Sequence, residues 1–205
     1  MSISLWLAFV VAAAVIAITP GPGSMLVLAT GLRYRYKSVF HALFGLELAL
    51  LIHLFIVALG LGALLATSNV AFMMMKIIGA VYLCWLGIQK WRASVEPIDT
   101  SKFNIAINRK LFRQGLLVNL TNPKAVIFIA AFVPQFIDAS APQLPQYLII
   151  GATMVGVDVV IMTVYALLAG RLSNWFQDTR MLRLQNRVFG GAFVSAGAFL
   201  AVSSR

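Results

Sequence analysis

The stretch TPGPG at residues 19–23 interrupts an apolar run, residues 3–28, that is otherwise long enough to form a membrane helix. Two prolines remove two backbone hydrogen-bond donors and two glycines loosen the chain, so the helix must break there. In lipid, each backbone group freed by such a break is costly unless another group satisfies it. A break at this depth is therefore tolerated only where it is buried in protein or lines a polar cavity.

A second interruption, NLTNPKA at residues 119–125, lies inside the apolar run that leads on to Pro134. The two breaks occupy like positions in the two halves of the chain, because each falls in a first apolar segment that is followed by two unbroken ones. We interpret the rest of the chain as a scaffold around these two interruptions.

The composition excludes a soluble domain. Of the 205 residues, 61% are hydrophobic and 11% are charged, and the mean hydropathy is +0.92. No basic segment precedes the first apolar run, which leads into a helix break and not into a cleavage site, so we interpret it as a retained helix and not as a signal peptide. The single cysteine, Cys84, excludes an internal disulfide and a CxxC redox pair.

The pattern predicts an all-α membrane protein with six transmembrane helices, arranged as two inverted three-helix repeats whose first and fourth helices are broken. Each apolar segment can cross a hydrocarbon core of about 30 Å, which takes about 20 residues. The segments cover residues 4–31, 39–66, 70–91, 112–137, 146–170 and 186–203. We expect a single polytopic membrane domain, residues 1–205, made of repeat one (3–91), a cytoplasmic linker (92–111) and repeat two (112–203).

The positions of the cations predict the orientation. The first, third and fifth connections hold three, six and four of the 16 Lys and Arg residues, whereas the turns of the second and fourth hold none. By the positive-inside rule, loops 32–38, 92–111 and 171–185 are cytoplasmic and both termini are periplasmic. Topology thus accounts for the net charge of +10, and no nucleic-acid partner is expected.

The paired breaks predict a transport site. A three-helix unit crosses the membrane an odd number of times, so a second copy is inverted, and broken helices in inverted halves are typical of the sites of secondary transporters. The half-helices after Pro22 and Pro123 then direct their positive N-terminal ends at one central region, which favours an anionic group such as a carboxylate. Thr19 and Asn122 are expected to cap these half-helices, and Lys124 adds a full positive charge. The alternative is that the prolines only shape helix packing.

Three ionisable residues in the apolar segments are candidates for proton coupling. Asp158, near the middle of the fifth segment, shares a helical stripe with Gly151 and Tyr165, and it would serve as a proton carrier or as the partner of a substrate ammonium. A structural pairing with Lys124 or His53 is the alternative. His53 itself is either a proton relay or a satisfied interhelical histidine.

Glu47 lies nearer the cytoplasmic end of the second segment. It is a candidate for a gate or a proton path, and its assignment rests only on its position in an apolar segment. The stripes Gly79/Gly87 and Gly190/Gly197 are interpreted as packing surfaces.

The motifs TPGPG at 19–23, GAVYLCWLG at 79–87 and NLTNPK at 119–124 together resemble the lysine exporter superfamily. Within it, the chain resembles the homoserine/threonine-resistance (RhtB-type) exporters most closely, over essentially its whole length. The resemblance implies a bacterial inner-membrane exporter of amino acids or close derivatives, driven by proton antiport, with homoserine, homoserine lactone or threonine as the substrate class.

Carried over residue by residue, the resemblance marks Pro20, Gly21 and Pro22 in the first helix and Asn122, Pro123 and Lys124 in the fourth. Asp158 matches an acidic residue of the fifth helix in relatives, whereas Glu47 matches no residue of the family pattern. The predicted substrate-binding set is Thr19, Pro20, Gly21, Pro22, Asn119, Asn122, Pro123 and Lys124, and the predicted proton-coupling set is Asp158, His53 and Glu47.

Several alternatives stay open at this point. Export of another amino acid, basic or leucine-like, would use the same scaffold, as would a passive channel, because broken helices also line pores. A metal-ion exporter is disfavoured by the presence of only two histidines, His41 and His53, and a redox carrier or membrane enzyme by the lone Cys84 and the lack of HExxH spacing. We expect no cofactor and no metal; the partners are a small-molecule substrate and membrane lipid, and the glycine-lined faces permit a homodimer without requiring one.

Overall fold

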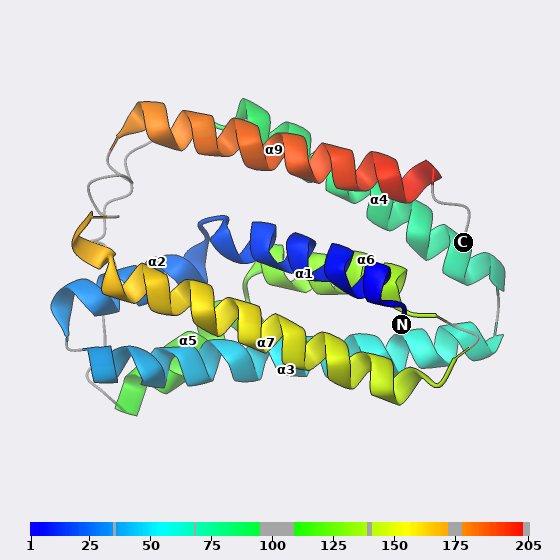
Figure 1. Cartoon of the computed structure of the whole chain (residues 1–205), viewed down its shortest axis with the longest axis horizontal. Coiled ribbons are helices and arrows are strands. Elements are labelled where there is room, and N and C mark those ends of the chain that lie inside the picture. The colour runs from blue at the N-terminus through cyan, green and yellow to red at the C-terminus, as the bar shows by residue number, and fades with distance from the viewer. Residues whose placement is uncertain (35, 68, 95–108, 139–140, 172–177, 203–205) are drawn as a thin grey trace.

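The computed structural model describes residues 1–34, 36–67, 69–94, 109–138, 141–171 and 178–202, and in these ranges the regular structure is helical. Most of the predicted linker 92–111 and part of the loops 32–38 and 171–185 lie outside the described residues. In chain order the elements are α1 (Ile3–Ile18), α2 (Pro22–Arg33), α3 (Tyr36–Thr67), α4 (Asn69–Arg92), α5 (Arg109–Leu120), α6 (Pro123–Phe132), the 3-10 helix η2 (Val133–Phe136), α7 (Gln143–Leu167) and α9 (Thr179–Val202) (Figure 1).

Both predicted breaks are present. The chain bends by 58° between α1 and α2 and by 56° between α5 and the α6–η2 segment. Each second half begins with a proline, Pro22 in α2 and Pro123 in α6. Proline is tolerated at this first helical position because its missing N–H would have no partner within the helix. The prediction of broken first and fourth helices is therefore confirmed.

The number of spans is tested only in part. By length and composition, Ser38–Gly60 within α3 and the whole of α7 can each cross a membrane, and each bent pair adds one more if it counts as a single span. This test covers only the described residues. Helix α4 covers the predicted segment 70–91, and α9 covers most of 186–203 but begins at Thr179, within the predicted loop 171–185. Neither helix is among these candidates, so the six-span, two-repeat arrangement stays a prediction.

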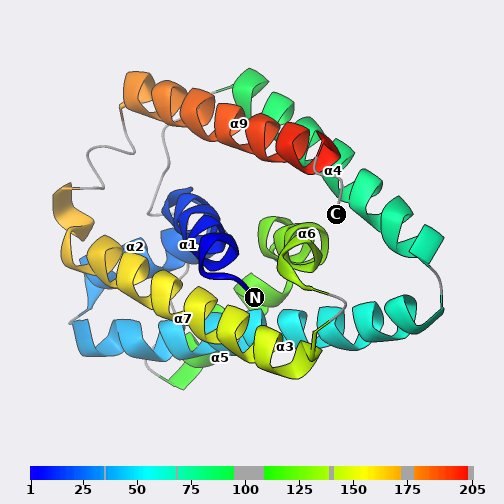
Figure 2. The same ribbon diagram turned by 45° about the vertical axis from the view of Figure 1, so that its right-hand side comes forward.

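The helices form a bundle with the two broken helices near its centre. Figure 2 looks almost along α1 and α6, which lie between the α4–α9 pair on one side and α3, α5 and α7 on the other. In Figure 1 the C-terminal ends of α2, α4 and α7 and the starts of α3, α5 and α9 lie at one end of the molecule, and the start of α1 and the end of α9 lie at the other.

Two helix pairs approach closely through glycines. In the α3–α5 pair, a Cβ atom on Gly45 would overlap the Phe112 carbonyl, and one on Gly115 would overlap the Ala42 carbonyl. In the α4–α9 pair, a Cβ on Gly87 would lie 2.6 Å from the Gly190 oxygen. Small residues allow this backbone approach in membrane bundles. The predicted packing role of the Gly87 and Gly190 stripes is thereby confirmed.

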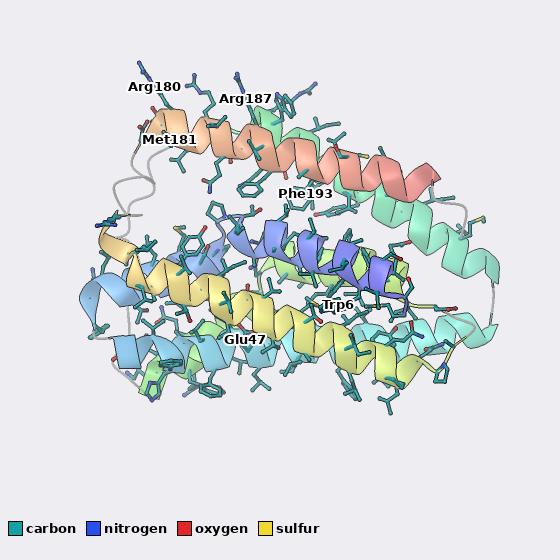
Figure 3. All side chains as sticks on the ribbon, in the orientation of Figure 1. Trp6, Glu47, Arg180, Met181, Arg187 and Phe193 are labelled. Carbon is teal, nitrogen blue, oxygen red and sulfur yellow. The ribbon has the colours of Figure 1, made fainter. Side chains whose placement is uncertain are left out.

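Aromatic side chains fill the space between the broken helices and their neighbours. The Phe9 ring of α1 meets the Phe136 ring of η2 edge to face, with 5.0 Å between centroids, and Phe128 stacks on Phe132 at 4.7 Å. Phe193 belongs to the same buried cluster and points from α9 toward the middle of the bundle (Figure 3). This packing fixes α1 and α6 against each other and thereby positions the two breaks.

Candidate functional site

A cavity of about 70 Å³ lies between the two breaks. Its polar wall consists of Gly21, Ser24, Asn119, Asn122, Lys124 and Asp158, which come from both breaks and from α7. The remaining wall is apolar and includes Leu46, Leu50, Phe128, Met154 and Met162. Residues that are a hundred positions apart in the sequence thus meet at one partly polar site.

Lys124 connects the second break to the first. Its ammonium donates hydrogen bonds to the Thr19 carbonyl at 2.6 Å and to the Ile16 carbonyl at 3.0 Å. These carbonyls belong to the C-terminal end of α1, where the helix dipole is negative; the Ile16 carbonyl also accepts from the Thr19 N–H at 3.1 Å. The ammonium also interacts electrostatically with Asp158. Lys124 therefore lines the cavity while it stabilises the end of α1.

The other carbonyls freed by the breaks also have side-chain donors. The Tyr165 hydroxyl of α7 donates to the Ile18 carbonyl at 2.6 Å. His53 Nε2 of α3 lies 3.3 Å from the Leu120 carbonyl at the end of α5, and because a carbonyl only accepts, this nitrogen carries the hydrogen. Each break is thus completed by a helix from the opposite half of the chain. The interhelical role considered for His53 is observed, and Tyr165 had been predicted only to share a stripe with Asp158.

The caps differ in one respect from the prediction. Asn122 caps α6, because its Oδ1 accepts from the Lys124 backbone N–H at 3.1 Å. The N-cap of α2 is Gly21 and not Thr19: the Ser24 Oγ accepts from Gly21 N–H at 2.8 Å. Thr19 lies at the C-cap of α1, and its hydroxyl donates to the Val15 carbonyl at 2.7 Å. The prediction for Thr19 was wrong because an N-cap directly precedes the first helical residue, and two residues separate Thr19 from Pro22.

The two carboxyl groups of α3 and α7 lie near each other. Asp158 lines the cavity, whereas Glu47 is not among the lining residues and is only 7% exposed. Within the described part of the chain, neither carboxyl oxygen of Glu47 has a hydrogen-bond partner. Its charged neighbour is Asp158, across the contact between α3 and α7; Figure 3 labels Glu47 where α3 runs alongside α7.

The three predicted prolines do not line the cavity. Pro22 and Pro123 are exposed at the first positions of their helices, and Pro20 is half-buried. These prolines act on the site through the backbone, by setting the bends. Asn119 does line it, and its side-chain amide donates to the Leu46 carbonyl at 2.7 Å.

No group of three or more His, Cys, Asp or Glu side chains arranged to hold a metal ion occurs among the residues that the structure describes. The polar wall consists of amide, hydroxyl, ammonium and carboxyl groups and backbone ends. This set is suited to a small zwitterionic molecule, because it offers donors for a carboxylate and an acceptor for an ammonium.

The fold and the cavity define a multi-pass helical membrane protein whose two interrupted helices meet at a polar site. The chain belongs to the LysE type translocator family, whose family model matches residues 14–204. This result confirms the resemblance to the lysine exporter superfamily that the three sequence motifs indicated.

Relatives with assigned names are efflux proteins. Over 202 residues the chain is 40% identical to the homoserine/homoserine lactone efflux protein of Salmonella typhi, and the alignment covers 98% of both chains. It is 38% identical over 203 residues, 99% of both chains, to an uncharacterized membrane protein of Vibrio cholerae. A leucine efflux protein of Enterobacter sp. is 29% identical over 94% of this chain and 93% of its own. No solved structure matches the chain.

Proposed function

We propose that the chain is a secondary transporter of the bacterial inner membrane that exports a small amino acid or derivative of the homoserine, homoserine lactone or threonine class by proton antiport. The observation that carries the proposal is the polar cavity formed jointly by the two breaks. The 40% identity to a homoserine/homoserine lactone efflux protein supports the substrate class.

The substrate carboxylate would bind at the N-terminal ends of α2 and α6, near Gly21 and Asn122, where the positive ends of the helix dipoles favour an anion. Lys124 adds a positive charge beside them. The substrate ammonium would bind Asp158, which also lines the cavity. Homoserine lactone has no free carboxylate, so its ester carbonyl would use the same donors more weakly.

Transport requires the helices to move. The cavity of about 70 Å³ is well below the roughly 300–1,000 Å³ of typical small-molecule sites. An amino acid therefore enters only when the helices around the breaks separate, as expected for alternating access around a central site. In the proposed orientation, the end of the molecule with the basic connections is cytoplasmic and both termini are periplasmic.

Export of a leucine-like amino acid is the second candidate. The apolar wall with Leu50, Phe128 and Met154 would accept an aliphatic side chain, and leucine efflux proteins are among the relatives. The homoserine class is preferred because that relative is more similar over the whole chain.

The test is the retention of radiolabelled homoserine, threonine and leucine by cells that over-express the chain, with and without a protonophore. We expect faster loss of homoserine or threonine that collapses when the protonophore is added. Pro123→Ala, which removes the break, and Asp158→Asn should abolish the effect. Asp138→Asn, which removes an exposed carboxylate outside the cavity, should leave it intact.

Loss that is insensitive to the protonophore would identify a channel and contradict the antiport. Loss of leucine alone would select the second candidate. Retention equal to that of empty cells, with well-expressed protein, would contradict both.

A further inference from the structure

Glu47 is a buried carboxyl group without a donor or a counter-ion of its own. It is 7% exposed, and in the described part of the chain both of its carboxyl oxygens lack a hydrogen-bond partner. An ionised carboxylate in such a place loses its hydration without compensation, which is among the most costly arrangements in a membrane protein. The neutral form of Glu47 therefore fits this buried position better than the ionised form.

The charged groups around Glu47 make this preference stronger. Of the helices packed against α3, α7 presents Asp158 and α6 presents Lys124. Lys124 is engaged by two carbonyls of α1 and interacts with Asp158. His53, on α3 itself, is engaged by the Leu120 carbonyl.

The remaining cations on helices that contact α3 lie elsewhere. Arg33, Lys110 and Arg113 are exposed, and Lys90 is near the C-terminal end of α4, where it interacts with Lys124. Among the groups described, the charged neighbour of Glu47 is thus an acid, and Lys124 interacts with that acid.

The two acids differ in their access to the cavity. Asp158 lines it, whereas Glu47 does not, although Leu46 and Leu50 on the same helix do. A substrate in the cavity therefore meets Asp158, and Glu47 senses the substrate only through Asp158. We propose that Glu47 binds and releases the coupling proton, while Asp158 binds the substrate ammonium and transmits its presence to Glu47. This assignment rests on the proposed function. The sequence left two roles open for Asp158, proton carrier and partner of the substrate ammonium, and the assignment gives them to two different residues.

The charges of Glu47 and Asp158 couple the outward movement of the substrate to the inward movement of a proton. When a cationic ammonium binds Asp158 from the cytoplasm, the negative charge beside Glu47 is neutralised, so the Glu47 carboxyl ionises more easily and its proton leaves to the cytoplasm. When the substrate leaves on the periplasmic side, Asp158 regains its charge and Glu47 takes a proton from that side. One proton thus moves inward for each ammonium that moves outward, and a proton on Glu47 weakens substrate binding at Asp158 without preventing it, because the two ligands share no atom.

The experiment compares two modes of transport by purified full-length protein in proteoliposomes. The first is exchange of radiolabelled homoserine for unlabelled homoserine at equal pH, which needs substrate binding and alternating access but no proton movement. The second is accumulation of homoserine driven by an imposed pH gradient. The variants are Glu47→Gln, Glu47→Asp, Asp158→Asn and the control Asp138→Asn, each checked for a monodisperse size-exclusion profile.

We expect Glu47→Gln to retain exchange but to lose at least about 90% of gradient-driven accumulation, because an amide cannot take up or release the proton. Asp158→Asn should lose both modes, and Asp138→Asn neither. In wild-type protein the apparent KM for exchange should rise as the pH falls, by less than the roughly tenfold per pH unit of full competition with one proton. In Glu47→Gln this pH dependence should disappear.

Gradient-driven accumulation by Glu47→Gln, or loss of exchange by a well-folded Glu47→Gln, would overturn the assignment. If Glu47→Gln does not fold, Glu47→Asp decides: a displaced pH profile supports the assignment, and an unchanged one overturns it. Wild-type protein that exchanges homoserine but ignores the pH gradient would overturn the antiport itself and the role of Glu47 with it. Wild-type protein that transports no homoserine in either mode would instead contradict the proposed substrate class.

Discussion

At the scale of single residues, the two breaks are stable because side chains from elsewhere in the chain donate to the carbonyls that the breaks expose. Lys124, Tyr165 and His53 contact carbonyls at the ends of α1 and α5. In hydrocarbon no water replaces a lost donor. These residues are therefore needed for folding as well as for any role in transport, and stability measurements must accompany transport measurements on their variants.

Tyr165→Phe should destabilise the protein, whereas Tyr147→Phe on the same helix should not. The Tyr165 hydroxyl donates to the Ile18 carbonyl, so its removal leaves a buried acceptor unsatisfied at a cost of about 1–3 kcal/mol. The Tyr147 hydroxyl is buried and has no partner among the described residues, so its removal should be neutral or stabilising. Thermal unfolding in detergent should show a lower Tm for Tyr165→Phe alone; equal shifts for the two variants would contradict the role of the Tyr165 bond.

Lys124→Met should destabilise the protein more than the double variant Lys124→Met/Asp158→Asn. The single change leaves Asp158 without its cation and removes the side-chain donor of the Thr19 carbonyl, whereas the Ile16 carbonyl keeps its bond from the Thr19 N–H. Lys124 and Asp158 are both half-buried, so an unpaired partner should cost about 1–3 kcal/mol, and removing both charges should cost less because no charge is left unpaired.

A double-mutant cycle in detergent measures the coupling between Lys124 and Asp158. Additive effects would contradict the pairing. Lys110→Met, at an exposed position of α5, is the control and should have little effect.

At the scale of elements, the glycines decide which helices can approach closely. Gly45 and Gly115 lie at the crossing of α3 and α5, where each would place a Cβ atom on a backbone carbonyl of the partner helix. Backbone cannot move aside as a flexible side chain can. The position of α5 thus depends on the absence of a Cβ atom at Gly45 and Gly115. The positions of Asn119 and the second break follow from it.

Gly45→Ala and Gly115→Ala should each destabilise the protein by about 1–3 kcal/mol, the usual cost of overpacking. Gly156→Ala in α7 meets no heavy atom within 4 Å, so it should stabilise the helix by up to about 1 kcal/mol. Yield and Tm in detergent measure these effects. A Gly45→Ala protein with wild-type Tm would show that α3 and α5 do not cross at these residues.

At the scale of the whole molecule, several of the described cations lie toward one end, whereas Lys124 lies at the central cavity. The helix ends that carry Arg33, Lys110 and Arg180 lie toward the left of Figure 1, and Arg180 and Arg187 point away from the bundle in Figure 3. This arrangement fits the proposed orientation with that end in the cytoplasm.

Single cysteines in a Cys84→Ser background test the orientation. Ser2→Cys, in the exposed N-terminal segment, should react with a membrane-impermeant maleimide in intact cells. Ser94→Cys, exposed just after α4, should react only after the cells are permeabilised. The reverse pattern would invert the proposed topology. Reaction at both positions in intact cells would place both residues on the periplasmic side and would contradict the odd number of spans predicted between them.

The sequence predicted the helical class, both breaks and the family, because these depend on local chemistry. Proline at 22 and 123 breaks a helix whatever surrounds it, and the apolar runs are membrane-like by length alone. The N-cap of α2 was misassigned to Thr19 because the identity of a cap depends on the exact residue at which the helix begins, and α2 begins at Pro22. The number of spans and the two-repeat symmetry stay predictions.

The tertiary structure decided which groups satisfy the breaks and which acids face each other. Helix packing brings together residues that are far apart in the chain. It places Lys124 at the carbonyls of α1, Tyr165 at the first break and His53 at the second, and Glu47 beside Asp158. Hydropathy and proline pattern determine where the chain enters and leaves a helix. The rotation of each helix and its distance from its neighbours are set by the glycines and the aromatic core, and they determine which groups each polar side chain contacts. The order of residues along the chain does not by itself give these contacts.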